Sequence, residues 1–279
     1  MYRQFFLSSY GVDIEKLVFD VEDWKKRTIM IPSLPEQEKI TLFFQRLDNL
    51  ITLHQRKLNN VKKLKAGLLQ KIFPKDGEDF PEVRFPGFTD AWEQRRLGEL
   101  AEFSKGSGYT KNDLTEGGSP IVLYGRLYTK YETVINDVDT FVEMKENSVV
   151  SEGNEVVVPA SGETAEDISR ASVIGKSGLI LGGDLNIIKS NQEIEPIFLA
   201  LTISNGTQQK EMSKCAQGKS VVHLHNSDLK QVNLLYPKLE EQQRIGKLFV
   251  EIDHLITIHQ RKLKHLQEQK KALLQQMFV

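Results

Sequence analysis

The sequence predicts an α+β protein in which one mixed α/β domain is flanked by two long helices that pair as an antiparallel coiled coil. Two observations predict the helices: a duplicated segment, and the spacing of apolar residues within it. A third observation predicts the domain, because the pattern between the two copies changes to short apolar runs broken by glycines. The chain has 279 residues, enough for one or two domains with their own cores.

Residues 36–73 and 241–278 are two copies of one segment. At an offset of 205, 18 of the 38 aligned positions are identical, including the run Ile-Thr-x-His-Gln-Arg-Lys-Leu at 51–58 and 256–263. Upstream, residues 23–31 align with 228–236. Solenoid repeats have periods of roughly 20 to 50 residues, so this longer period indicates two copies of one larger module.

Both copies predict a long helix, because apolar residues recur at steps of three and four and so share one stripe. Each copy opens on glutamates, which suit the positive end of the helix dipole. Such helices are roughly 55 Å long, too long to lie on one small domain, so we expect the stripes to cover each other. Two separate core helices are the alternative. The residues expected at the interhelix or partner interface are Ile40, Phe44, Leu47, Ile51, His54, Leu58, Ile245, Phe249, Ile252, Ile256, His259 and Leu263.

The composition of the chain limits which classes of protein it can belong to. The net charge is −1, so only a local basic face could mark a nucleic-acid-binding protein. Residues 56–75 are such a stretch, with lysines and arginines but no acidic residue, although a solvated helix face is the commoner explanation for lysines on a helix. The single Cys215 excludes a disulfide framework. No run of 18 apolar residues and no signal-peptide pattern is present, so we expect a cytoplasmic protein without a membrane segment.

The part between the helices predicts a linker and a mixed domain. Residues 76–91 are rich in turn-forming residues, and residues 92–238 hold short apolar runs. We expect strands over 121–124, 155–158, 172–174 and 179–181. One short helix is expected from Glu195–Pro196 to Ile203, because proline suits an early helical position. The expected boundaries are therefore 1–31, a first helix at 32–75, the linker, the domain, and a second helix at 239–279.

Several motifs in order resemble the DNA-specificity (S, or HsdS) subunit of type I restriction–modification systems. They are Pro-x-Leu-x-Glu-Gln-x-x-Ile at 32–40 and 237–245, the paired helices, and Arg-Phe-Pro-Gly-Phe at 84–88 followed by the run at 92–100. The resemblance covers the whole chain. It implies two target-recognition domains that each read half of a split DNA site, separated by helices whose length sets the spacer, and no catalytic activity.

The chain departs from that pattern because it shows one complete target-recognition domain. Residues 1–31 resemble the remnant of the end of a first one. We therefore expect a half-subunit that forms a homodimer and reads one half of a split site. The resemblance implies double-stranded DNA, methyltransferase (M) subunits and a restriction/translocase (R) subunit as partners. No cofactor is expected on this chain, since S-adenosylmethionine and ATP would belong to partner subunits. The alternatives are a structural coiled-coil adaptor and an inactive fragment.

Basic and aromatic residues in four loops are the candidate DNA contacts. Lysines suit phosphates, and the forked guanidinium of Arg126 suits the edge of a guanine. For each residue, an ordinary exposed polar side chain is the alternative. The candidates are Lys105, Ser107, Tyr109, Lys111, Arg126, Tyr128, Lys130, Ser161 and Lys219.

Enzyme motifs are incomplete. The Gly-Lys-Ser runs at 175–177 and 218–220 lack the earlier glycine of a phosphate loop, since Arg170 and Ser213 stand there. Ser161 lacks the first glycine of a nucleophile elbow. The six histidines show no metal-ligand spacing. We therefore expect a non-catalytic protein with no metal site.

Overall fold

The structure is a computed structural model that describes residues 9–10, 18–19, 21–28, 30–215 and 222–277. The chain divides into two compact units, Met1–Val61 with Ile256–Val279, and Lys62–Leu255. The first unit contains long stretches of both long helices, and the second contains the central domain (residues 92–238). None of the described helices is long and apolar enough to cross a membrane.

The two duplicated segments form the two long helices, α3 (Leu34–Ile72) and α10 (Leu239–Met277), each of 39 residues. Together they are called the helix pair. Both begin in the same way, because the amide of Gln37 donates to Pro32 O and that of Gln242 donates to Pro237 O, each at 2.8 Å. The duplication in sequence is thus a duplication of local structure, and the two expected helices are confirmed.

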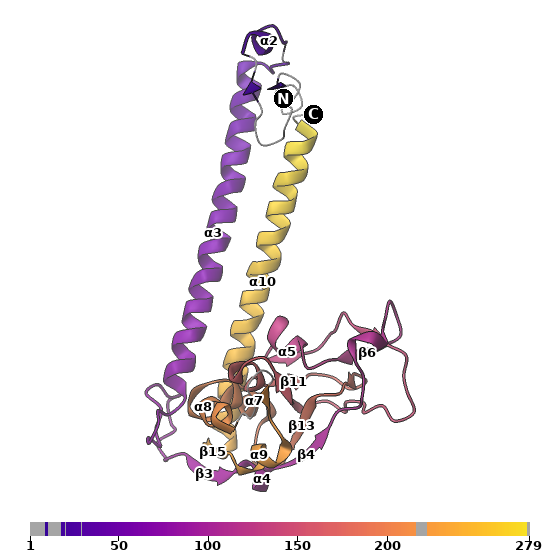
Figure 1. Ribbon diagram of the computed structural model, residues 1–279. Helices are drawn as coiled ribbons and strands as arrows, with labels where there is room; N and C mark the ends of the chain where they lie inside the picture. The colour runs from indigo at the N-terminus through magenta and orange to yellow at the C-terminus, as the bar shows by residue number, and fades with distance from the viewer. Residues whose placement is uncertain (1–8, 11–17, 20, 29, 216–221, 278–279) are drawn as a thin grey trace. The chain divides into compact units, whose positions relative to one another are not determined.

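The helices of the pair are antiparallel. In the first unit, α3 and α10 run side by side (Figure 1), with Nδ1 of His54 3.2 Å from Nδ1 of His259 and Lys270 paired with Asp48 at 2.5 Å. Leu58 and Leu263 are 5% and 9% exposed. In the second unit, Lys65 pairs with Asp253 at 2.5 Å. The predicted apolar stripes of α3 and α10 therefore pack against each other, whereas the stripe of an isolated amphipathic helix would stay exposed to water.

The residues before α3 form short elements. The pair β1 (Ser9–Tyr10) and β2 (Val18–Phe19) is antiparallel, and α2 (Val21–Lys25) follows it. Subtracting the repeat offset of 205 from α9 (Asn226–Gln231) gives residues 21–26, so α2 stands where the repeat predicts a short helix.

The central domain is built around a mixed five-stranded sheet in the order β4-β13-β9-β11-β7. Figure 1 labels β4, β13 and β11 of this sheet. Its strands are β4 (Ala101–Lys105), β7 (Val134–Ile135), β9 (Val156–Pro159), β11 (Ser172–Ile174) and β13 (Leu185–Ser190). All its neighbouring strands are antiparallel except β11 and β7. A second sheet has the order β12-β6-β8-β5. Its strands are β5 (Leu114–Thr115), β6 (Ser119–Val122), β8 (Phe141–Val142) and β12 (Ile180–Leu181).

Two further strand pairs and several short helices complete the domain. The pairs are β3 (Glu93–Arg96) with β15 (Asn233–Tyr236), and β10 (Ser161–Gly162) with β14 (Val222–His223). The helices are α4 (Leu97–Leu100), η1 (Lys111–Asp113), α5 (Arg126–Thr129), α6 (Ala165–Ile168), α7 (Pro196–Ser204), α8 (Gly206–Cys215) and α9. Residues 73–92 contain no helix or strand.

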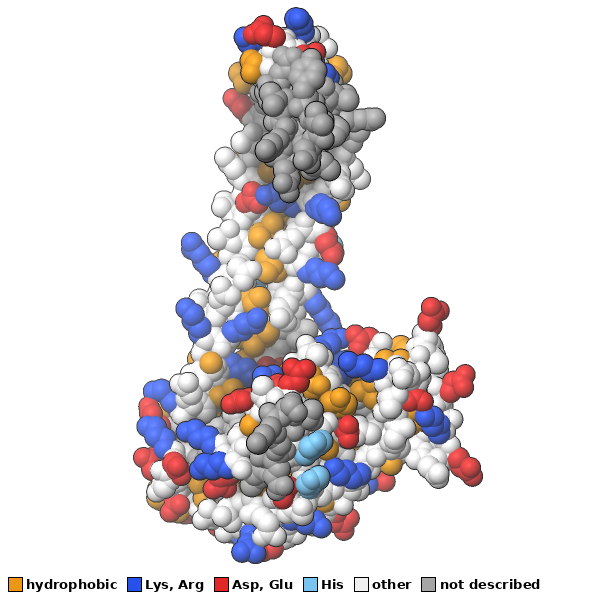
Figure 2. Space-filling model, in the orientation of Figure 1, with side chains coloured by type: hydrophobic (Ala, Val, Ile, Leu, Met, Phe, Trp, Pro, Cys, Tyr) orange, Lys and Arg blue, Asp and Glu red, His pale blue; other side chains and the backbone are white. Residues whose placement is uncertain are grey.

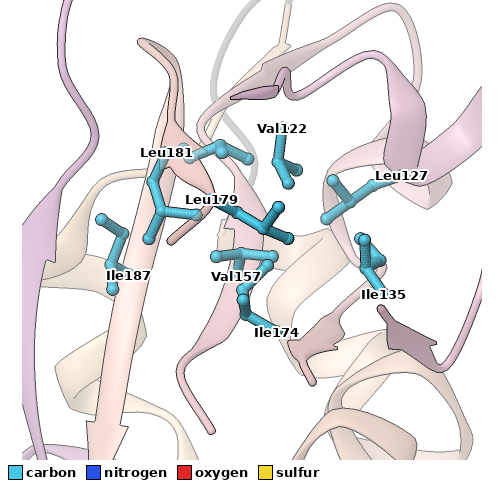
Figure 3. Close-up of a cluster of buried hydrophobic side chains, with 9 residues drawn as sticks. Val122, Leu127, Ile135, Val157, Ile174, Leu179, Leu181 and Ile187 are labelled. Atoms are coloured by element: carbon cyan, nitrogen blue, oxygen red, sulfur yellow. The ribbon is translucent and has the colours of Figure 1, made fainter. Parts of the chain in front are cut away.

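The core lies where the strands predicted from apolar runs meet. Figure 3 shows a cluster of nine buried residues, among them Val157 of β9, Ile174 of β11 and Ile187 of β13. All four residues of β9 are buried, as expected for an interior strand covered on both faces. The four predicted strands correspond to β6, β9, β11 and β12, and the predicted helix to α7. The continuous apolar runs identified these elements because neither face meets water.

Helix α7 anchors the domain core. Glu195 caps it by accepting a hydrogen bond from Phe198 N at 2.6 Å, and Pro196 takes the first helical position, where no backbone donor is needed. Phe198 is fully buried and contacts the rings of Phe73 and Trp92 at centroid distances of 6.0 and 5.6 Å. The residues that follow α3 and open the domain are therefore tied to the same core.

Candidate nucleic-acid interface

Eight of the nine candidate contacts lie in three groups of neighbouring residues. Lys219 is outside the described residues. The other eight fall around Asp184, around Ser148 and around Asp139. The first two groups are neighbours, because Gly183, next to Asp184, closely approaches the backbone of Ser107 and Tyr109.

Lys105 and Ser161 meet at Asp184. Lys105 ends β4 and is exposed, whereas Ser161 in β10 is 7% exposed and donates to Oδ2 of Asp184 at 3.3 Å. Partial burial lowers the pKa of Lys105, and the charge of Asp184 acts against that shift. Asp184 itself has a φ of 59°, in the left-handed region that aspartate tolerates better than most residues. Lys105 is thus an exposed cation beside a tight turn, and Ser161 supports that turn.

Two histidines lie beside this turn, and sequence reasoning assigned them no DNA contact. Ser161 pairs with His223 across the β10–β14 ladder, and the rings of His223 and His225 are parallel within 3° at a centroid distance of 6.3 Å. Both are exposed while Leu224 between them is fully buried. Figure 2 shows histidine side chains at the surface. Alternation around Leu224 was the available signal, since residues two apart on a strand share a face.

Asn226 completes this surface. Its Nδ2 donates to Ser104 O at 2.9 Å, while its buried Oδ1 has no hydrogen-bond partner among the described residues. A buried amide oxygen normally finds a donor, so this atom has unused capacity. We define the Asp184 cluster by the residues that gather here: Lys105, Ser161, Asp184, His223, His225 and Asn226.

The second group is largely structural. Tyr109 is 5% exposed, and its hydroxyl contacts Ser148 and accepts a hydrogen bond from Lys145 N at 2.8 Å. Ser107 donates to Leu181 O at 3.3 Å and accepts from Val149 N at 3.2 Å. Both side chains therefore hold the loop in place, and only Lys111 at the start of η1 is exposed to an approaching ligand.

The third group is an ion-pair cluster. Arg126, expected to be the foremost base contact, has a side chain only 8% exposed and donates to Glu132 at 2.7 Å and Asp139 at 2.8 Å. It also donates to Asp137 O at 2.9 Å. Lys130 is exposed and pairs with Asp139 at 2.9 Å. Tyr128 is half-buried and packs edge-on against Tyr124.

The expectation for Arg126 therefore needs a correction. A guanidinium that already faces two carboxylates and a carbonyl oxygen has little left to offer a base. Its role is to fix the segment 126–139. The sequence suggested exposure because arginine stands among aromatics, but Glu132 and Asp139 are brought to it only by the fold. Tyr109 needs the same correction, since its ring belongs to the core.

The side chains expected at the interhelix interface are not equally buried on the two helices. Leu47, Leu58, Ile252 and Leu263 are at most 9% exposed, and Ile51, His54, Ile256 and His259 are half-buried. Ile245 and Phe249 are fully buried, whereas their equivalents Ile40 and Phe44 are only half-buried. The first turns of α10 are held by the central domain, where Gln242 accepts from Glu195 N and donates to Glu193 O, each at 2.9 Å. The described residues of α3 show no such partner for Gln37 beyond Pro32.

In the described part of the chain, no three His, Cys, Asp or Glu side chains come together as a metal site requires. The surface features that remain are the Asp184 cluster and a row of exposed apolar side chains on the helix pair. That row includes Leu50 (46% exposed), Leu53 (46%) and Ile258 (45%).

Comparisons with known proteins point to one family. The family model described as the type I restriction modification DNA specificity domain matches residues 6–63 and 89–268. The type I restriction enzyme MjaVIII specificity subunit of Methanocaldococcus jannaschii is 23% identical over 257 residues, which are 88% of this chain and 60% of that protein. The putative MjaX specificity subunit of the same organism is 24% identical over 272 residues, 90% of this chain and 58% of that protein. The chain thus spans about 60% of the length of these relatives.

Solved structures share the fold. The HsdS subunit of Thermoanaerobacter tengcongensis has a TM-score of 0.56 at 20% identity, over 99% of this chain and 66% of that one. The type I S subunit of M. genitalium has a TM-score of 0.60 at 15% identity, over 98% and 68%. The resemblance found in the duplicated helices and the motif at 84–100 is therefore confirmed. Because the family model matches both helical segments and the domain between them, this chain belongs to the type I restriction–modification DNA-specificity family.

Proposed function

We propose that this chain is a non-catalytic DNA-reading subunit of a type I restriction–modification complex, and that its central domain reads one half of a split DNA site. The observation that carries the proposal is the family match, which spans both helical segments and the central domain. The relatives bear the name specificity subunit, and the fold agrees with the solved S subunits.

The Asp184 cluster is the surface that we propose for DNA contact. Lys105 is an exposed cation, and it forms no ion pair with the described residues. Cations of this kind bind phosphates, while the exposed side chains of His223 and His225 offer donors and acceptors to base edges. By contrast, Arg126 and Lys130 of the third group are already ion-paired with carboxylates. Lys105 lies near Asp184 but forms no ion pair with the described residues, which favours the Asp184 cluster for a phosphate contact.

The helix pair supplies the assembly role in this proposal. The exposed row of Leu50, Leu53 and Ile258 suits an apolar face of a methyltransferase (M) subunit, because exposed apolar rows on a helix mark binding surfaces. The restriction/translocase (R) subunit would join the same complex. We propose that S-adenosylmethionine and ATP bind those subunits rather than this chain, as the resemblance to specificity subunits implies.

The second half of the site requires a second central domain. A second copy of this chain would supply one, and a two-fold assembly of identical readers would recognise a palindromic split site. The alternative is a scaffold that holds partner subunits without reading DNA.

Methylation mapping tests the proposal. The chain is expressed with its cognate methyltransferase subunit, and methylated bases in plasmid DNA are mapped. A split methylated motif is expected, and Lys105→Ala with His223→Ala should weaken or abolish it. The matched control is Lys176→Ala, which removes an exposed lysine paired with Asp137 in the third group. If both proteins are soluble and no motif is methylated, the proposed split-site assembly is wrong, and failure to bind a single half-site duplex as well would leave the scaffold.

A further inference from the structure

The polar contacts across the helix pair come in equivalent pairs. Lys65 contacts Asp253 and Lys270 contacts Asp48, each at 2.5 Å. Adding the repeat offset of 205 to residues 65 and 48 gives 270 and 253, so each contact is the counterpart of the other. His54 and His259 are also equivalent by that offset, and they meet each other at 3.2 Å. These contacts follow the rule of a two-fold interface, in which residue i meets j and the equivalent of j meets the equivalent of i.

Each helix therefore carries one aspartate, one histidine and one lysine that make the polar contacts with the other helix. On α10, Asp253 and Lys270 stand 17 positions apart (270 − 253), as Asp48 and Lys65 do on α3 (65 − 48). The buried seam agrees, because Leu58 and Leu263 are the same residue type and have similar exposure. Nothing in these contacts distinguishes α3 from a second α10, although pairing specificity usually requires such a distinguishing feature.

We propose that α10 of one copy of this chain pairs with α10 of a second copy, in place of α3. In that pair Lys270 of each helix meets Asp253 of the other, and the two His259 side chains meet at the two-fold axis. The proposal rests on the proposed function, because it names the partner that would complete the split-site reader.

The choice of α10 rather than α3 follows from what each helix holds. Gln242 ties the first turns of α10 to the central domain through Glu195 N at 2.9 Å. Glu241 ties them to the linker before that domain, because both of its oxygens accept from Arg84 at 2.8 Å. The equivalent Glu36 is exposed, and Ile40 is only half-buried. A pair of two α10 helices therefore carries one firmly held central domain per helix. Within one chain α3 competes for the same face, because tethering gives it a millimolar effective concentration.

Charge reversal on α10 alone tests the exchange. The variant Asp253→Lys with Lys270→Asp places like charges opposite Lys65 and Asp48 but keeps opposite charges between two α10 helices. We expect its dimer dissociation constant, measured by sedimentation equilibrium, to fall at least about tenfold below that of the unmodified chain. The matched control adds Asp48→Lys and Lys65→Asp, which restores the intramolecular pairs and should return the unmodified value. Both variants lose the hydrogen bond from Thr133 to Asp253, so its loss cancels in the comparison. Equal dissociation constants for the two variants would overturn the proposal.

Cross-linking at the two-fold axis provides an independent measurement. In a Cys215→Ser background, His259→Cys should form a covalent dimer on mild oxidation at protein concentrations where the dimer is populated. Adding His54→Cys should divert part of the product into an intramolecular disulfide, which confirms that the position is reactive. A reactive intramolecular pair without any covalent dimer from His259→Cys alone would contradict the exchange.

Failure of the exchange and failure of DNA reading are distinguishable. Binding of a single half-site duplex depends on the central domain and requires no second copy. If the charge-reversed chain stays monomeric but binds that duplex, only the exchange is wrong. If it dimerises but binds no duplex, the DNA-reading proposal is wrong and the exchange stands.

Discussion

Arg84 donates from two guanidinium nitrogens to both oxygens of Glu241, each at 2.8 Å, although 157 residues separate them in the sequence. The side chain of Glu241 is 1% exposed and that of Arg84 is 14% exposed. Each charged group is therefore largely removed from water and is stabilised by the other. Arg84 also donates to Asp90 O at 2.6 Å. This one pair fixes the linker before the central domain to the first turn of α10.

Arg84→Ala should therefore destabilise the chain by about 3–5 kcal/mol, because it leaves the carboxylate of Glu241 buried without a counter-charge. The free energy of unfolding, from urea titrations followed by circular dichroism, measures this. Lys189→Ala is the control, since its pair with Glu152 is exposed and should be worth less than about 1 kcal/mol. Equal effects would contradict the interpretation of the buried pair.

Gly106→Ala should be among the most disruptive small substitutions in the central domain. A Cβ at Gly106 would lie 1.9 Å from Gly182 O, a backbone atom that cannot move without shifting its strand. A loss of about 3 kcal/mol or more is expected, beyond the usual cost of overpacking. Gly108→Ala is the matched control, since nothing lies within 4 Å of its added Cβ. Thermal unfolding of both variants decides the matter, and similar midpoints would contradict the close approach.

Arg126→Ala should affect stability rather than sequence reading. Removing the guanidinium leaves Glu132 and Asp139 without their shared partner, and about 1–3 kcal/mol should be lost because hydrogen bonds to charged groups are involved. At a temperature where the variant is fully folded, its preference among DNA sequences should be unchanged. A changed methylation motif in the folded variant would restore Arg126 as a base contact.

Lys105→Ala and Lys111→Ala should weaken DNA binding without changing the recognised sequence. A lysine that contacts one phosphate releases about one counterion, so each loss should reduce the slope of log K against log salt by about 0.9. Fluorescence anisotropy at several salt concentrations provides the slope. The control is Lys189→Ala. An unchanged slope for Lys105→Ala would exclude the Asp184 cluster from the phosphate contacts.

The helix pair should lose stability as the pH falls. Partial burial lowers the pKa of His54 below its ordinary value of 6.5, with the charges of His259, Lys57 and Lys262 acting in the same direction. The unfolded chain then binds a proton more readily than the folded chain. Stability is therefore complete above about pH 7 and declines as the pH falls through 6.5 towards the lowered pKa. Helix content against temperature at pH 8 and pH 5.5 should show the decline, and His54→Gln should reduce it.

The sequence by itself determined the elements whose signals are local. The 205-residue repeat and its apolar stripe specified both long helices, because a helical face repeats every 3.6 residues whatever surrounds it. Continuous apolar runs such as Val156–Val158 specified interior strands for the same reason. The motifs at 32–40 and 237–245 specified the family, since their order and duplication are written directly in the chain.

Tertiary structure decided the fate of individual polar side chains. The sequence predicted that Arg126 and Tyr109 are exposed. In the fold, the guanidinium of Arg126 pairs with Asp139, and the hydroxyl of Tyr109 contacts Ser148. His223 gained a place in the candidate interface because a strand pair sets it opposite Ser161. Charge neutralisation and burial depend on neighbours distant in sequence, so no local pattern could have assigned these roles. The periodicity of the chain placed its elements, and only their packing determined which of its charges are paired and which are exposed.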